Sequence, residues 1–261
     1  MHVRLDSLTS GPFLPPLTRR KFDFSPWTAL PSPSATHAGA EMGCPSAVNC
    51  VERTAALVLL ALISPLMLLI ALAIKLDSPG GPVLFRQERV GLDRRRRRAP
   101  GDSSAPGQDR RTARGAGQVF MIYKFRTMIP NAERKTGPVW ATEDDPRITR
   151  VGAILRQLRF DELPQLFNIV RGQMRLIGPR PERPHFVSQL VQEIPDYAQR
   201  HRVHPGITGL AQVEREYDSC IKDVRTKLKY DLFYVNNRCG LMDAKILVKT
   251  VGVMVRGKGA R

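Results

Sequence analysis

Two adjacent carboxylates, Asp161 and Glu162, begin a segment whose residue types suit group transfer. Residues 162–170 carry a helical apolar pattern that Gly172 closes. Neighbouring side chains on a helix point about 100° apart, so one carboxylate can attack a phosphorus centre while the other holds a hard cation such as Mg²⁺. A purely structural interpretation uses the same geometry. Asp161 would cap the helix, and Pro164 would be tolerated in its first turn.

An arginine between two prolines is the second candidate. Arg180 lies between Pro179 and Pro181, and the second proline disfavours the α conformation for the arginine. A stiff loop that presents one guanidinium suits bidentate phosphate recognition, although a turn with a solvent-facing arginine has the same sequence. Three more cations would either extend a phosphate-binding surface or be ordinary surface charge: Lys124, Arg126 and Arg156.

The remaining residues do not predict a metal centre. His201 and His204 are three positions apart, and no third ligand lies near them in the sequence. The cysteines form no CxxC pair and are too few for a disulfide scaffold, so reduced thiols are expected. They are Cys44, Cys50, Cys220 and Cys239.

Apolar periodicity predicts the elements that must position these groups. Residues 119–123 indicate a short strand. Helices are expected over 154–159, 162–170, 182–194, 221–235 and 241–255. This pattern predicts a single α/β domain that is rich in helix.

The strongest physical signal is the run at 55–74, which holds 20 residues without a charge. As a helix it would be about 30 Å long, the thickness of the bilayer's hydrocarbon core, although a buried core helix is the alternative. Ser64 and Pro65 lie at its centre, where proline predicts a kink or a break. The segment would therefore span the membrane with a kink or enter one leaflet and return. Basic residues on both flanks favour two cytoplasmic ends, and hence re-entry.

The charge of the chain predicts an anionic partner. Its 261 residues include 41 Lys and Arg against 24 Asp and Glu, a net charge of +17. Nucleic acid, an acidic membrane surface or phosphorylated substrates would each answer that charge. Disorder is expected in the proline-rich tail at 1–48 and in the arginine-rich insertion at 92–118, which would be solvated or attached to lipid headgroups. Residues 256–261 form a basic C-terminal tail.

The order of the motifs resembles the bacterial sugar transferase family, the monotopic polyprenyl-phosphate phosphoglycosyl transferases. The resemblance covers residues 49–255 apart from the insertion, and it includes the apolar hairpin at 55–74. Its motifs are FRQERVG (85–91), IYKFRTM (122–128), DPRITRVG (145–152), DELPQLFN (161–168), GPRP (178–181), PGITGLAQV (205–213) and YDLFYVNN (230–237).

This resemblance implies a membrane enzyme that moves a sugar-1-phosphate from a UDP-sugar to undecaprenyl phosphate and releases UMP. Such a step initiates exopolysaccharide, O-antigen or capsule synthesis. The resemblance also implies a re-entrant membrane helix, with the catalytic domain on the cytoplasmic face of the inner membrane, in contact with its lipids. The sequence is compatible with a monomer or with a homo-oligomer.

Residue roles follow from the same resemblance. Asp161 would be the nucleophile that forms a covalent phospho-sugar intermediate, and Glu162 would coordinate Mg²⁺. Positions associated with phosphate binding are matched by Arg156, Pro179 and Arg180. Nucleotide contacts would come from Gln212 and Arg215.

Several positions depart from the family's usual pattern. Gln173 and Arg175 replace an Asp and a Ser before GPRP, and His204 stands where Arg or Lys usually precedes PGITG. Arg215 comes one position earlier than the family's arginine. Contacts that depend on the replaced side chains are therefore not implied for this chain.

Two rival functions use the same charge. A membrane-anchored basic protein would bind nucleic acid or anionic lipid without catalysis, and it would not need Asp161 or Glu162. No helix-turn-helix, zinc-finger or RRM signature supports nucleic acid as a partner. An inactive scaffold would keep the fold alone, which the intact carboxylate pair argues against.

Overall fold

The computed structural model describes residues 24–28, 46–93, 117–132, 145–214 and 221–255. The chain forms two compact units, residues 1–32 and 33–261. In the first unit the structure describes one short helix, α1 (Ser25–Thr28). The remaining elements belong to the second unit. The expectations for most of the 1–48 tail, for the insertion between 94 and 116 and for the C-terminal tail lie outside the described residues.

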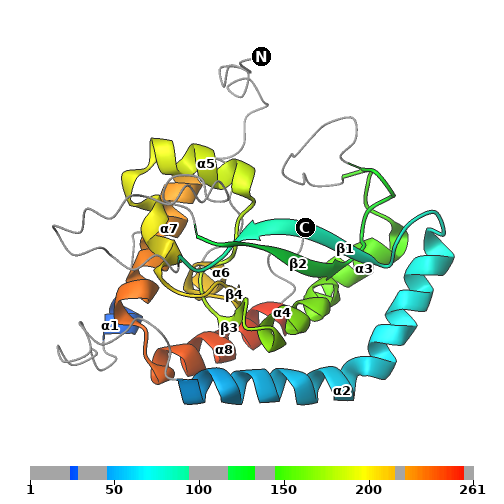
Figure 1. The fold of residues 1–261 in the computed structure, drawn as a ribbon, viewed down its shortest axis with the longest axis horizontal. Coiled ribbons are helices and arrows are strands. Elements are labelled where there is room, and N and C mark those ends of the chain that lie inside the picture. Colours follow the sequence, from blue (N-terminus) through cyan, green and yellow to red (C-terminus); the bar gives the residue numbers. More distant parts are fainter. Residues whose placement is uncertain (1–23, 29–45, 94–116, 133–144, 215–220, 256–261) are drawn as a thin grey trace, which may run out of the picture. The chain divides into compact units, whose positions relative to one another are not determined.

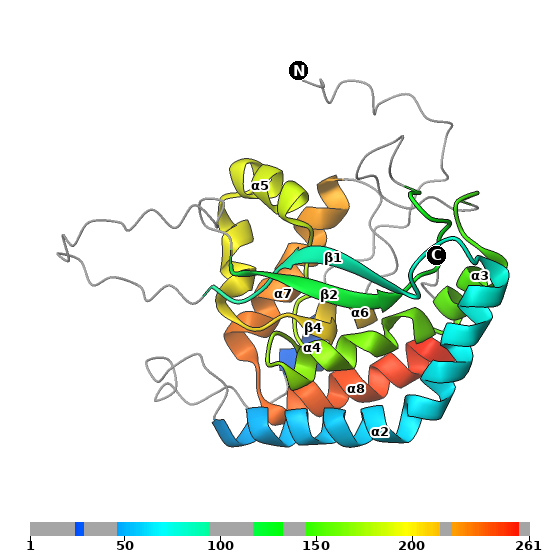
Figure 2. The ribbon, with the colours of Figure 1, turned by 45° about the vertical axis from the view of Figure 1, so that its right-hand side comes forward.

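The predicted apolar run lies within α2 (Ser46–Asp77), a single helix of 32 residues. Pro65 lies inside this helix and has no N–H to donate to the carbonyl of Ala61. The Ser64 hydroxyl donates to that carbonyl instead, at 2.8 Å. Figures 1 and 2 show that the second half of α2 turns away from the line of the first. The expected helix-break-helix is therefore one continuous, bent helix.

One side of α2 packs on the unit and the other is apolar and exposed. Ala56 and Leu60 join the core around Ile169, and Ile70 and Ile74 pack near Phe125 in a second cluster. The stretch from Asn49 to Asp77 is long and apolar enough to cross a membrane. Its exposed leucines are Leu57, Leu59, Leu62, Leu66, Leu68, Leu69, Leu72 and Leu76.

The strands β1 (Leu84–Val90) and β2 (Val119–Phe125) pair antiparallel, with Leu84 opposite Phe125. The predicted strand at 119–123 is therefore confirmed, and its partner strand is a finding of the structure. Phe120 and Ile122 are buried on one side of the hairpin. Because strand side chains alternate, Lys124 follows on that same side, at the end of β2.

A short parallel pair brings two motif loops together. β3 (Arg175–Ile177) pairs with β4 (Gly206–Thr208), so the GPRP loop that follows β3 lies against the PGITG segment. A Cβ on Gly206 would lie 2.1 Å from the backbone nitrogen of Gly178. Glycine is therefore required where the two loops cross.

Several helices follow β3 in the described part of the chain. They are α5 (Pro184–Glu193), η4 (Pro195–Arg202), a 3₁₀ helix, α6 (Leu210–Glu214), α7 (Ile221–Asn237) and α8 (Gly240–Val255). A cluster that includes Val90, Val187, Tyr197 and Leu228 joins β1, α5, η4 and α7. The helices predicted at 182–194, 221–235 and 241–255 are confirmed to within a few residues.

Two earlier helices differ from their predicted bounds. α3 (Arg150–Gln157) begins before residue 154, because the Thr149 side chain caps it by accepting from the Gly152 nitrogen at 3.0 Å. The single helix expected at 162–170 is divided into η3 (Phe160–Gln165), a 3₁₀ helix, and α4 (Leu166–Val170). Pro164 lies in η3 and lacks the N–H that an α-helix would use there.

Candidate active site

The carboxylates Asp161 and Glu162 are buried side by side in η3, with 12% and 10% of their side chains exposed. Arg159 precedes η3 in the left-handed conformation, with φ of 60°. No side-chain hydrogen bond caps η3, and Asp161 lies within this helix. The capping interpretation of Asp161 is therefore wrong, and the burial of both carboxylates needs another explanation.

Two cations from distant parts of the chain contact Glu162. Lys124 Nζ, at the end of β2, lies 2.9 Å from Glu162 Oε1 and 3.7 Å from Asp161 Oδ2. Arg180 places Nη2 2.5 Å from Glu162 Oε1 and Nη1 3.4 Å from Oε2. Two predicted site residues, Lys124 and Arg180, therefore contact the Glu162 carboxylate, and Asp161 has the weaker cationic contact.

These contacts move the two acids in opposite directions. Burial raises the pKa of Asp161. The positive charge of Lys124 lowers this pKa, and the negative charge of the nearby Glu162 raises it. Burial alone would also raise the pKa of Glu162, but Arg180 and Lys124 outweigh it and hold the pKa well below its ordinary value. Adjacent carboxylates with such a difference are typical of sites that divide two chemical roles between them.

Arg156 is brought to the same side of the site by α3. Its Nε donates to the Thr127 hydroxyl at 2.9 Å, and its charge lowers the pKa of Asp161 as a smaller effect. A Cβ on Gly152 would lie 2.1 Å from the Thr127 carbonyl oxygen, so α3 packs closely on the KFRTM segment. Arg156 is therefore held beside the carboxylates by a packed helix.

The GPRP loop is fixed through its carbonyl groups. Pro179 and Pro181 carry no N–H, yet each of the four carbonyls at 179–182 accepts a hydrogen bond from another part of the chain. The donors, in order, are Gly206 N (3.1 Å), Arg200 Nη2 (2.7 Å), Arg89 Nη1 (3.1 Å) and Val90 N (2.9 Å). The rigidity that the prolines predicted is therefore completed by β1, η4 and β4.

Two other predicted residues, Arg126 and Gln212, have their contacts away from the carboxylates. Arg126 is buried and donates to the carbonyl of Ser78, in the turn after α2. Gln212 lies in α6, where its Nε2 donates to the Ile207 carbonyl at 3.0 Å. Arg215 lies outside the described residues.

Sequence reasoning missed the side chains that support the GPRP loop. Arg89 and Asp231 occur in the FRQERVG and YDLFYVNN motifs, but the motifs alone gave them no role. Arg200 and Glu182 lie outside the named motifs. The one signal in the sequence is that Arg89 and Asp231 lie within named motifs.

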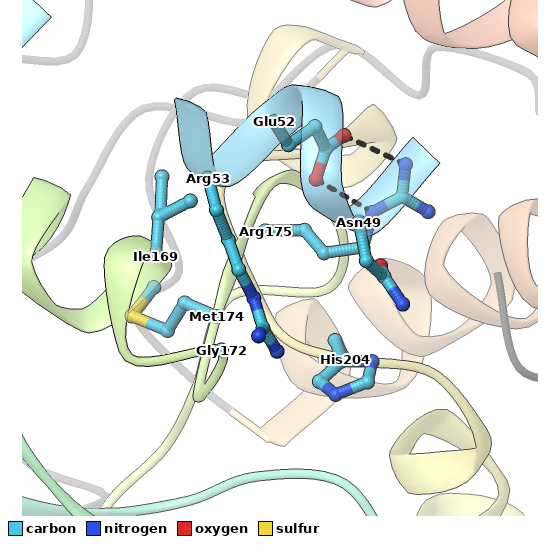
Figure 3. Close-up of a pocket in the computed structure, with 8 residues that line it drawn as sticks. All are labelled: Asn49, Glu52, Arg53, Ile169, Gly172, Met174, Arg175 and His204. Carbon is cyan, nitrogen blue, oxygen red and sulfur yellow. Dashed lines mark hydrogen bonds and ion pairs between the residues drawn. The ribbon is translucent and has the colours of Figure 1, made fainter. Parts of the chain in front are cut away.

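A second polar cluster ties the start of α2 to β3 and α8 (Figure 3). Arg175 donates from Nε and Nη2 to the two oxygens of Glu52, at 2.9 and 2.7 Å, and lies 3.6 Å from Asp243. A Cβ on Gly172, where φ is +69°, would collide with the Arg53 guanidinium. The arginine that departs from the family pattern is therefore an anchor for the start of α2.

The histidines and cysteines do not form a further site in the described part of the chain. His201 is buried, and burial together with Arg200 lowers its pKa to about 3, so it is neutral at pH 7. Within that part, no group of three or more His, Cys, Asp or Glu is arranged around a metal position. Cys50 and Cys239 are free thiols.

Comparison with known proteins identifies the family of the chain. Residues 46–99 and 103–257 match the family described as bacterial sugar transferase. A UDP-N-acetylgalactosamine-undecaprenyl-phosphate N-acetylgalactosaminephosphotransferase of Aeromonas hydrophila is 44% identical over 211 residues, which are 81% of this chain and 44% of that protein. The chain thus spans less than half the length of this relative.

Two further relatives are covered more fully. A UDP-glucose:undecaprenyl-phosphate glucose-1-phosphate transferase of Caulobacter vibrioides is 41% identical over 205 residues, 77% of this chain and 67% of that protein. The exopolysaccharide production protein PSS of Rhizobium leguminosarum bv. phaseoli is 38% identical over 209 residues, 77% of this chain and 91% of that protein.

Proposed function

Because the chain belongs to the bacterial sugar transferase family, we propose that it transfers a sugar-1-phosphate from a UDP-sugar to undecaprenyl phosphate and releases UMP. The observation that carries the proposal is the buried pair of Asp161 and Glu162 with Lys124 and Arg180 against it. Relatives named for this transfer support it. The step would initiate synthesis of an exopolysaccharide, an O-antigen or a capsule.

The proposed reaction has two displacements at one phosphorus atom. An oxygen of the Asp161 carboxylate attacks the phosphorus that carries the sugar, and the bond from that phosphorus to the bridging oxygen breaks. UMP leaves with that oxygen and its electron pair, and an acyl phosphate remains on Asp161. An oxygen of undecaprenyl phosphate then attacks the same phosphorus, and Asp161 leaves as a carboxylate.

The electrostatics favour Asp161 over Glu162 as the nucleophile. Glu162 has both oxygens paired with Arg180 and one also with Lys124, which stabilises its charge and lowers its basicity. Burial raises the pKa of Asp161, so its carboxylate is the more basic of the two. A more basic carboxylate is the better nucleophile.

The cations match the charge of the substrates. A diphosphate and a lipid phosphate bring several negative charges to one place, and fixed positive groups are needed to offset them in the transition state. Lys124, Arg156 and Arg180 would supply this charge. The two terminal nitrogens of Arg180 that hold Glu162 are arranged for bidentate contact with a phosphate.

Mg²⁺ is the proposed cofactor, and the adjacent carboxylates Asp161 and Glu162 are of the donor type that it uses. This ion is commonly held by one or two carboxylates together with substrate phosphate oxygens. Glu162 would hold the ion, which would neutralise charge on the diphosphate when bound. Since Lys124 and Arg180 contact the same carboxylate, a cation at Glu162 would compete with both ion pairs. The nucleotide is proposed to contact Gln212 and Arg215.

We also propose that α2 enters and leaves the cytoplasmic leaflet on the same side. Near its start Glu52 pairs with Arg175 of β3, and at its end Asp77 accepts from the Val151 nitrogen of α3 at 3.1 Å. Both ends therefore contact the same compact unit through polar groups, whereas a spanning helix would place its ends on opposite faces. The catalytic domain, residues 49–255, would then lie on the cytoplasmic face of the inner membrane.

The test is release of UMP by purified protein with undecaprenyl phosphate, Mg²⁺ and a panel of sugar donors. Because the relatives are named for N-acetylgalactosamine and for glucose, the panel contains UDP-glucose, UDP-galactose and their N-acetyl derivatives. Donor without acceptor should add the mass of one sugar phosphate to the protein. Asp161→Asn should abolish both signals, although membrane association remains.

Asp243→Asn is the matched control for that variant. Burial raises the pKa of Asp243 as it does for Asp161, but Asp243 lies in α8, outside the proposed site. The control should keep the covalent adduct. UMP release by Asp161→Asn at the wild-type rate would refute the assignment of the nucleophile, and anion binding without turnover in the wild type would favour the non-catalytic rival.

A further inference from the structure

Arg200 is a buried cation that no part of the proposed chemistry uses. It lies in η4, and 2% of its side chain is exposed. Its Nη2 lies 2.8 Å from an Asp231 carboxylate oxygen and donates to the Arg180 carbonyl at 2.7 Å, and its Nη1 donates to the Tyr197 hydroxyl at 2.6 Å. The Asp231 side chain is 3% exposed.

The burial of this pair calls for an explanation other than stability. Removing two charges from water costs about as much as their attraction returns, so a buried ion pair is weak support for a fold. Arg200, however, joins three segments. Asp231 comes from α7, Arg200 from η4, and the carbonyl that accepts from Arg200 belongs to the GPRP loop.

The carbonyl that Arg200 holds belongs to the residue that contacts Glu162. Pro181 already restricts the backbone of Arg180 to extended conformations. Fixing the carbonyl of the same residue sets the remaining backbone rotation, and this directs the side chain toward η3. Arg180 then reaches Glu162 with both terminal nitrogens.

We propose that Arg200 and Asp231 are positioning residues, which hold Arg180 in the orientation that phosphate binding requires. This inference rests on the proposed function, in which Arg180 binds a substrate phosphate. Asp231 lies against the Arg200 guanidinium and compensates its charge, while Nη2 of that guanidinium donates to the Arg180 carbonyl.

The charge balance around Arg200 agrees with this role. Burial alone would lower the pKa of Arg200, but Asp231, Tyr197 and Glu182 more than compensate and raise it above its ordinary value. The guanidinium thus stays charged within the protein. A neutral residue at 231 would leave the orientation of that guanidinium less defined.

A double-mutant cycle tests the inference. Arg180→Lys removes bidentate contact but leaves a charge, so residual UMP release can be measured. Asp231→Asn is nearly the same size as the native residue and keeps one oxygen acceptor, and Arg200→Lys serves as a second variant. A misplacement of about 1 Å can cost a hundredfold in rate, so each of these two single variants is expected to lower kcat/KM by roughly tenfold to a hundredfold.

If Arg200 and Asp231 act through Arg180, replacing Asp231 should have little further effect on the rate once Arg180 has been replaced. The double variant Arg180→Lys, Asp231→Asn should then be within about threefold of Arg180→Lys alone. If Asp231 has a merely structural role, the two losses in kcat/KM should multiply, because the effects of independent sites are additive in free energy. The melting temperature of every variant is measured alongside.

Arg202→Lys is the matched control. Arg202 is in the same helix, and its Nη1 contacts the Asn236 side chain at 3.4 Å instead of the GPRP loop. The control should keep wild-type kcat/KM. Losses that multiply in the double variant, or unchanged rates in both single variants, would overturn the inference. The proposed function would still stand in that case, provided that the covalent adduct on Asp161 forms. Absence of UMP release from the wild type would overturn both.

Discussion

Glu162 binds Arg180 through both carboxylate oxygens, at 2.5 Å from Nη2 and 3.4 Å from Nη1. Among the described residues, the ion pair of the preceding acid, Asp161, is a longer 3.7 Å contact with Lys124. The pKa values of two acids in one turn of a 3₁₀ helix are therefore shifted in opposite directions. This difference leads us to expect that neutral replacements of the two acids change stability in opposite directions.

Glu162→Gln should lower the free energy of unfolding. The change leaves Lys124 and Arg180 facing a neutral amide, and loss of one partner from a buried ion pair typically costs about 3 kcal/mol or more. Unfolding of the detergent-purified protein, with Mg²⁺ absent, measures the difference. A variant as stable as the wild type would show that Glu162 is not the centre of these ion pairs.

Asp161→Asn should raise the free energy of unfolding at neutral pH, by about 1 kcal/mol. The pKa of Asp161 is raised in the folded protein above its ordinary value of 3.8, so the carboxylate destabilises the fold at pH values above the raised pKa. As pH falls through that pKa, the advantage of the variant should shrink, and it should vanish below 3.8. A constant difference at all pH values would contradict this origin.

Apolar periodicity identified α5, α7 and α8, because each of these helices buries a regular face against the same unit. Local pattern was insufficient where one residue overrides the period. Pro164 divides 162–170 into η3 and α4, and the Thr149 side chain begins α3 before its apolar positions start. Each of these effects depends on a single hydrogen bond that is made or missing. The spacing of apolar residues carries no information about such a bond.

The sequence predicts those candidate site residues that lie within recognisable motifs. The sequence led to Asp161, Glu162 and Arg180, but it did not reveal that Arg200 and Asp231 hold the Arg180 loop. Arg126 lies in the same motif as Lys124, yet it turns to the carbonyl of Ser78. Partners that are remote in the chain meet only through the fold, so local spacing does not pair them.

The contribution of Glu182 to the stability of the protein should decrease at acid pH. Burial alone would raise its pKa, but Lys227 and Arg89 outweigh this effect and lower it from 4.5 to about 2. The stabilisation is therefore complete above pH 4.5 and is lost as pH falls toward 2. The melting temperature of wild type minus that of Glu182→Gln should decline over this range.

Glu193→Gln is the control for that pH series, because Glu193 is exposed at the end of α5. Its melting temperature should stay close to that of the wild type throughout. A difference between wild type and Glu182→Gln that persists unchanged at the lowest pH would count against the ion pairs of Glu182 with Lys227 and Arg89 as its source.

Arg175→Ser, which restores the residue usual in the family, should destabilise this chain. Arg175 is 6% exposed and Glu52 is 14% exposed at the side chain, so the loss leaves a largely buried carboxylate and should cost about 3 kcal/mol. Adding Glu52→Gln should recover part of that loss. Arg171→Ser, at an exposed position, is the control, and equal melting temperatures for Arg175→Ser and Arg171→Ser would refute the anchoring role.

The two ends of α2 should be accessible from the same side of the membrane. Cys50 is an exposed native thiol near the start of the helix, and Ser78→Cys places a probe just past its end. Each is tested alone, with the other cysteines replaced by serine. In intact spheroplasts, an impermeant maleimide should label neither position, and after the membrane is opened it should label both. Labelling of one position from outside would establish a spanning helix and contradict the inference drawn from the contacts of Glu52 and Asp77 with one unit.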